Sequence, residues 1–196
     1  MQQWRTMPVR RLVSILGVAS LLSTGAVALD EAQPLATTTA CIESRLDVGD
    51  DSVAAMLHCI PGLRRADLTT VKLSGSSSAQ CSLYSQRPVV IQGSAPLDFL
   101  PATVWGALSV CDVDAVHVWI GQLRNVDLGT SLHVHPSISE GPTRLAVFRV
   151  EQPCLTTPDG SYVVSSTAQY KPLELTALPV SAANVSAPEE IICPLS

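Results

Sequence analysis

The sequence predicts a mainly β fold, an antiparallel sandwich or barrel-like domain with one short N-terminal helix and disulfide bonds. Three observations lead to this prediction. Short segments rich in Val, Ile, Leu and Thr alternate with clusters of Gly, Pro and Ser, as strands and turns do. Helical patterns are not interleaved among these segments, which is untypical of α/β folds. An even number of cysteines follows a signal-like N-terminus.

The N-terminus has the pattern of a secretory signal peptide. Arg5, Arg10 and Arg11 precede an apolar run, Leu12–Leu22, and small residues follow at Ala26–Ala28. We expect a signal peptide over residues 1–28, with cleavage after its last alanine. The apolar run is shorter than the about 20 residues that cross a bilayer. The alternative is an uncleaved N-terminal anchor.

The expected mature protein is acidic. Three of the 12 Lys and Arg residues leave with the signal peptide, so nine basic residues face 17 acidic ones and the net charge is −8. This charge opposes binding to phosphate backbones, and nucleic acid is not an expected partner. No later apolar run is long enough to be a transmembrane segment. The pattern predicts a secreted or cell-surface protein.

The cysteines predict disulfide bonds rather than a metal site. No two of them have the Cys-x2-4-Cys spacing of thiolate zinc sites. Six cysteines allow 15 pairings, and the sequence does not choose among them. The six are Cys41, Cys59, Cys81, Cys111, Cys154 and Cys193.

The folded part is expected to begin at the first cysteine. Residues 29–40 are polar and aperiodic, which predicts a flexible N-terminal segment before a single β-rich domain over residues 41–196. The best helix candidate is Asp50–Ile60, where Asp51 or Ser52 can cap the first free N–H groups. Pro61-Gly62 then ends the helix.

The strand candidates follow the helix. They are Leu68–Ser74, Arg87–Gln92, Thr103–Val110, Val113–Gln122, Asn125–His135, Arg144–Val150, Ser161–Thr167 and Leu173–Val180. Trp105 and Trp119 fall in these strands and are the expected large anchors of the core. A β-solenoid is the alternative fold, because residues 108–134 run on with little punctuation. No repeat of fixed length supports it.

The stretch Ala115–Ser139 combines a candidate core with three histidines. Side chains alternate between the two faces of a strand, so His117 and Trp119 share one face and the valines around them share the other. We expect the aliphatic face to be buried and the histidine face to point away from the core. The residues expected to be buried are Val116, Val118, Ile120, Leu132 and Val134.

The histidine face is a candidate metal site. His133 and His135 stand side by side on one strand, and His117 from a neighbouring strand would complete a three-nitrogen site with an open position. Glu140 would add an oxygen ligand. The sequence thus offers a possible divalent-metal site at these four residues, which rests on their spacing alone.

The eight residues from His133 to Glu140 are similar to the first metal motif of the cupin family, in its germin-type form. In that family the two histidines and the glutamate are metal ligands, with a further histidine from a second motif, and manganese is a usual metal. The resemblance implies that His133, His135 and Glu140 bind a metal. No histidine follows His135, so the second motif is missing.

The remaining features point to an extracellular surface. Asn184-Val185-Ser186 is an N-glycosylation acceptor in a loop-like C-terminal stretch. The loops expected to contact a partner are Ser74–Gln80, Gly93–Pro101 and Ser137–Thr143.

The sequence favours binding over catalysis. It has no nucleophile elbow, no phosphate-binding glycine loop and no His-Glu-x-x-His run. We therefore expect a secreted or cell-surface glycoprotein that acts as an extracellular interaction module with a protein or glycan partner. Two alternatives stay open: a metal-binding protein or metalloenzyme that uses the histidine cluster, and a structural surface or matrix protein.

Overall fold

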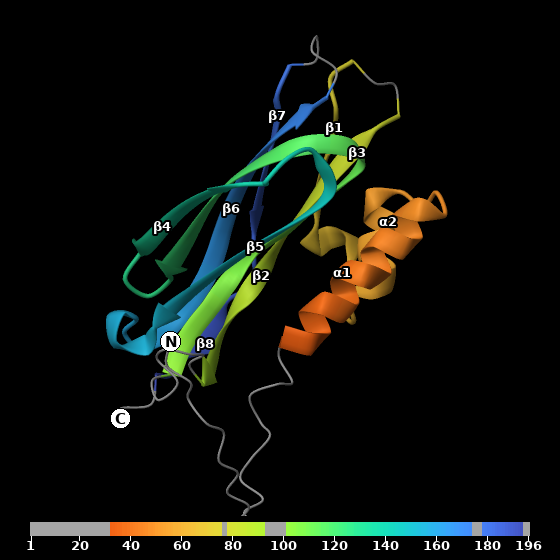
Figure 1. Ribbon diagram of the computed structural model, residues 1–196. Coiled ribbons are helices and arrows are strands. Elements are labelled where there is room, and N and C mark those ends of the chain that lie inside the picture. Colours follow the sequence, from red (N-terminus) through yellow and green to blue (C-terminus); the bar gives the residue numbers. More distant parts are fainter. Residues whose placement is uncertain (1–31, 76–77, 93–100, 174–177, 194–196) are drawn as a thin grey trace, which may run out of the picture.

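A computed structural model describes residues 32–75, 78–92, 101–173 and 178–193. The expected signal peptide and most of the expected loop Gly93–Pro101 lie outside the described residues. The predicted fold class is confirmed: the described part is mostly β, and its antiparallel sheet is nearly closed into a barrel (Figure 1). A β-solenoid is not supported.

Two helices and two short 3-10 helices accompany eight strands in the described residues (Figure 1). The helical elements are α1 (Ala32–Asp47), α2 (Ser52–Cys59), η1 (Arg65–Asp67) and η2 (Cys154–Thr156). The strands are β1 (Thr69–Lys72), β2 (Gln80–Gln92), β3 (Pro101–Asn125), β4 (Thr130–Ile138), β5 (Thr143–Pro153), β6 (Gly160–Pro172), β7 (Val180–Val185) and β8 (Glu189–Ile191).

Strand β3 is the centre of the fold. Its first part pairs with β2, up to Cys111, on one side and with β5 on the other. Its last part pairs with β6 from Ala115 and with β4 from Val118. We call β1, β2, β5 and the start of β3 the first half-sheet. The rest of β3 forms the second half-sheet with β4, β6, β7 and β8. The two expected strands 103–110 and 113–122 are thus one strand.

The two half-sheets enclose the main core. Trp105 from the first half-sheet and Trp119 from the second are both fully buried, with ring centroids 5.9 Å apart. Trp119 also stacks on Phe148, at a centroid distance of 5.2 Å and an interplanar angle of 7°. The prediction that the two tryptophans anchor the core is confirmed.

Helix α2 confirms the sequence prediction, with narrower bounds. The Asp51 carboxylate caps it by accepting a hydrogen bond of 2.6 Å from Ala54 N. The helix packs against the outer face of the first half-sheet (Figure 1). Met56 is buried there in a second core that includes Leu108 and Val110 of β3.

Helix α1 is an element that the sequence did not predict. Its first half occupies residues that we expected to be a flexible segment, and Thr-rich sequence is a poor helix former. The reason is tertiary packing: Ile42 and Leu46 are buried in the second core, and the Cys41–Cys59 disulfide links α1 to α2.

All six cysteines form disulfide bonds, as predicted. The pairing, which the sequence left open, joins each cysteine to its neighbour in sequence order. Cys41–Cys59 links the helices, and Cys81–Cys111 joins directly opposite residues of β2 and β3. Cys154–Cys193 ties the C-terminal end to the residues after β5.

The C-terminal strands lie later in the sequence than expected. The stretch Leu173–Val180 was a strand candidate, whereas β7 starts at Val180 and residues 174–177 lie outside the described residues. The pattern of β7 was easy to miss, because its inward-facing residues include the small Ala182 and the polar Asn184. Strand β8 follows in a stretch that reads as acidic loop.

Candidate functional site

The two faces of β3 beyond Ala115 are reversed relative to the prediction. His117 and Trp119 are fully buried, whereas Val116 and Val118 are only partly buried and Ile120 is 44% exposed. The aromatic ring decides the orientation, because burying Trp119 removes more apolar surface from water than burying a valine or isoleucine does.

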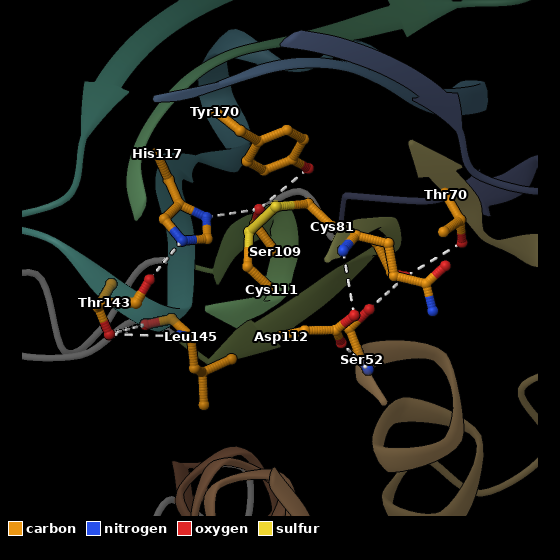
Figure 2. The surroundings of a disulfide bond; sticks show 12 residues. Ser52, Thr70, Cys81, Ser109, Cys111, Asp112, His117, Thr143, Leu145 and Tyr170 are labelled. Carbon is orange, nitrogen blue, oxygen red and sulfur yellow. Dashed lines mark hydrogen bonds between the residues drawn. A yellow bond between two sulfur atoms is a disulfide. The ribbon is translucent and has the colours of Figure 1, made fainter. Parts of the chain in front are cut away.

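His117 is a fully satisfied core histidine. Its Nε2 donates to the carbonyl oxygen of Thr143 at 2.8 Å, and its Nδ1 lies 2.8 Å from the hydroxyl of Ser109 (Figure 2). The ring of Tyr170 meets it edge-on, with centroids 5.4 Å apart. Burial lowers the pKa of His117, while the bond to Thr143 raises it.

The Ser109 hydroxyl connects His117 to Tyr170, and its proton can serve only one of them. Its oxygen is 3.1 Å from the Tyr170 hydroxyl and is placed to donate to it. A neutral His117 needs that proton at Nδ1, because its own proton is on Nε2. A protonated His117 donates from Nδ1 and frees the Ser109 proton for Tyr170, whose pKa is raised to about 12 by burial.

The other two histidines also face the inner side of their strand. In β4, His133 lies opposite Leu123 and His135 lies opposite Gly121, and both of these β3 residues are buried. His135 is nevertheless exposed, with its ring 6.3 Å from that of Trp119. The aliphatic residue between them, Val134, is 58% exposed rather than buried.

The structure does not assemble the four predicted metal ligands. Both ring nitrogens of His117 have protein partners, and Glu140 lies exposed in the β4–β5 loop. Within the four described ranges, no three His, Cys, Asp or Glu side chains gather closely enough to hold a metal ion. A site built on His133 and His135 alone stays a prediction.

Asp112 is a linking residue that sequence reasoning missed. It follows the Cys81–Cys111 disulfide, and its carboxylate accepts hydrogen bonds from Ser52 N at 2.6 Å and from Gln80 N at 3.0 Å (Figure 2). It therefore joins β3 to the start of α2 and the start of β2. In the sequence, the feature that could have indicated this role is the position of Asp112 directly after Cys111 in a predicted strand region.

Asn184, the predicted glycosylation site, lies in β7 and is 8% exposed. Its Oδ1 accepts from Ser85 N at 2.8 Å, and its Nδ2 donates to Asp67 O at 3.1 Å and to Thr69 Oγ1 at 3.2 Å. These bonds help to close the barrel between β7 and the β1–β2 pair. A glycan on Nδ2 would replace one of its two hydrogens and so remove at least one of the two hydrogen bonds that Nδ2 donates. The presence of a glycan stays a prediction.

The outer face of the second half-sheet carries exposed apolar side chains in directly opposed positions. Across β3 and β4, Val118 faces Ile138 and Ile120 faces Pro136. Ile138 is 61% exposed, and Val134 continues the same row. Exposed apolar groups of this kind, gathered in one place, are typical of interaction surfaces.

This outer face also differs from the rest of the protein in charge. Although the sequence has 17 Asp and Glu residues, none lies in β4, β6, β7 or the part of β3 after Asp114. The charged residues of these strands are Arg124 and Lys171, and both are exposed. The acidic Glu189 and Glu190 stand at one end, in β8.

Comparison with known proteins finds no matching family model, no matching curated protein and no matching solved structure. The similarity of His133–Glu140 to the germin-type cupin motif is therefore not extended by any wider match. No helix in the described part of the protein is long and apolar enough to cross a membrane.

Proposed function

We propose that this protein is a secreted binding module that recognises a protein partner through the outer face of its second half-sheet. The observation that carries the proposal is the set of directly opposed apolar pairs on β3 and β4, Val118 with Ile138 and Ile120 with Pro136. Val118 is partly buried, and the other three side chains are exposed. Three disulfide bonds support an oxidising compartment, as does the signal-like N-terminus of the sequence.

The charge of this face specifies the chemistry of the partner. The apolar row lies between two exposed cations, Arg124 and Lys171, and no carboxylate lies in β4, in β6 or in the part of β3 after Asp114. A complementary surface has an apolar centre flanked by Asp or Glu side chains. Carbohydrate is a poorer fit, because the aromatic rings of these strands, Trp119, Tyr162 and Tyr170, are all buried.

The matrix-protein alternative predicts pairing of cysteines between molecules. All six cysteines are paired within one molecule, so self-association would have to use non-covalent contacts. The same outer face is the available surface for such contacts, and the experiment below therefore includes a self-association arm.

The test is capture of extracellular proteins by the full secreted protein and by two variants. Ile120→Asp places a carboxylate in the apolar row, and Val147→Asp is the matched control on β5, where the side chain is 38% exposed. We expect one partner to be held by the wild type and by Val147→Asp, to be lost with Ile120→Asp, and to be released as salt rises.

Two results would contradict the proposal. If Ile120→Asp captures the same partner as strongly as the wild type, the outer face is not the binding surface. If sedimentation shows a dimer of the wild type that Ile120→Asp abolishes, the partner is a second copy of the protein, and the matrix alternative replaces the proposal. Circular dichroism of each variant verifies that it is folded.

A further inference from the structure

A second surface feature, separate from the outer face described above, is a cavity of about 490 Å³. Three segments that are distant in sequence line it: the α2–β1 connection at 61–67, β2 at 84–87, and the β7–β8 connection at 185–187. Its volume is in the range of cavities that hold small ligands. Apolar walls are supplied by Leu63 and Val185, among others.

Most polar groups of this cavity are already engaged. The Asp67 carboxylate accepts three hydrogen bonds from Arg64, at 2.9, 3.3 and 3.2 Å, and these lower its pKa. The Ser85 hydroxyl donates to the Asn184 carbonyl at 3.1 Å, and the Ser186 hydroxyl donates to a neighbouring carbonyl at 2.9 Å. These groups are not free to bind a ligand.

Two donors of the cavity remain. Tyr84 has a partly buried hydroxyl without a hydrogen-bond partner among the described residues, and burial raises its pKa so that it keeps its proton. Arg87 is exposed and contacts Glu189 at 3.7 Å, which is longer than a hydrogen bond. Arg87, Tyr84 and Asp67 all line this cavity.

The position of Arg87 comes from an irregularity in β2. Gln86 pairs with Gly106 and Val89 pairs with Val104, so β2 has one more residue than β3 in this interval. Such a bulge redirects the side chains at the extra residue, and bulges often occur beside binding sites. The bulge lets Arg87 line the same cavity as Tyr84 of the regular strand.

We propose that this cavity binds a carboxylate attached to a small apolar body. One carboxylate oxygen accepts from the Arg87 guanidinium, and the other accepts from the Tyr84 hydroxyl. The hydrogen bond from the guanidinium to the carboxylate is strengthened by charge. The apolar body rests against Leu63 and Val185. The ligand carboxylate replaces the long contact between Arg87 and Glu189.

The test is titration of the isotope-labelled full-length protein with N-acetyl-leucine and with its amide, followed by NMR. We expect the acid to shift the amide signals of residues 62–67, 84–87 and 185–187, and the neutral amide to leave them in place. Arg87→Gln should weaken binding at least about tenfold, which is the effect of losing a hydrogen bond to a charged group. Tyr84→Phe should weaken it less.

The matched control is Arg65→Gln, which removes an exposed arginine of the same connection that does not line the cavity. It should bind as the wild type does. A peptide that ends in leucine tests whether the natural carboxylate is the C-terminal group of a peptide, because the peptide should then bind more tightly than the free acid. Equal binding of acid and amide, unchanged binding by Arg87→Gln, or no shift by any probe would overturn the proposal.

Discussion

At the scale of single residues, the fold buries polar side chains only where partners are supplied. His117 is fully buried because Thr143 and Ser109 satisfy both ring nitrogens. Asn184 is buried because Ser85, Asp67 and Thr69 use its amide group. Without these bonds, each of the two side chains would have buried polar atoms without partners, which costs about 1–3 kcal/mol for each group.

The buried His117 predicts a specific acid sensitivity. Its pKa is lowered in the folded state, so below the pKa of about 6.5 in the unfolded state the unfolded protein binds more protons. The free energy of unfolding should therefore fall as the pH drops below about 6.5. His117→Gln should be less stable at neutral pH, but it should lose less of its remaining stability on acidification.

Urea unfolding between pH 8 and pH 5 would measure this difference. His58→Gln is the control, because His58 is exposed on α2. It should follow the pH dependence of the wild type. A His117→Gln curve that runs parallel to the wild-type curve over the whole range would show that this histidine does not cause the acid sensitivity.

At the scale of elements, β3 belongs to both half-sheets, and its Gly121 allows the core rings to approach the strand. A Cβ atom added at Gly121 would lie 2.1 and 2.2 Å from ring carbons of Trp119 and 2.8 Å from Trp105. The ring of Trp119 thus lies over the backbone of its own strand, which places it against Phe148.

This close packing predicts that Gly121→Ala is strongly destabilising. The added methyl group has to displace two buried tryptophan rings, and overpacking of this kind typically costs about 1–3 kcal/mol or more. Gly141→Ala is the matched control, because nothing lies within 4 Å of a Cβ there. Thermal unfolding should show a clear loss for the first variant and little change for the second, and equal effects would refute the packing argument.

In the edge strand β4, Pro136 opposes pairing with a further strand. Ser139 donates its N–H to the carbonyl of His117, and the alternation of an antiparallel ladder then turns the backbone nitrogen of Pro136 away from β3. Proline has no N–H to offer to a further strand. The face of this hairpin is therefore a better docking surface than its edge.

At the scale of the whole molecule, the features that the sequence predicted are those that depend on local patterns of residues. The β class, the disulfide state, the Asp51 cap and the tryptophan core follow from composition and short-range spacing. The period of a strand shows that His117 and Trp119 share a face, but not which face is buried, since that depends on how the half-sheets close. The cavity at Arg87 combines three distant segments, and no local pattern reports it.

Helix α1 is also a feature that local sequence patterns do not predict, because its stability comes from tertiary contacts. The Cys41–Cys59 disulfide closes an 18-residue separation, which stabilises the folded protein by about 3 kcal/mol in the loop-entropy model. The double variant Cys41→Ala/Cys59→Ala should lower the free energy of unfolding by about this amount. Its amide hydrogens in α1 should exchange faster, while those of β3 stay protected.

The control for this experiment is Cys154→Ala/Cys193→Ala, which removes a disulfide that involves neither α1 nor α2 and has a sequence separation of 39. It should also lower the free energy of unfolding, by a similar amount. It should leave exchange in α1 unchanged, because Ile42 and Leu46 stay packed in the second core. If α1 exchanges equally in both variants, its order depends on global stability, and the local link to α2 is not what holds it.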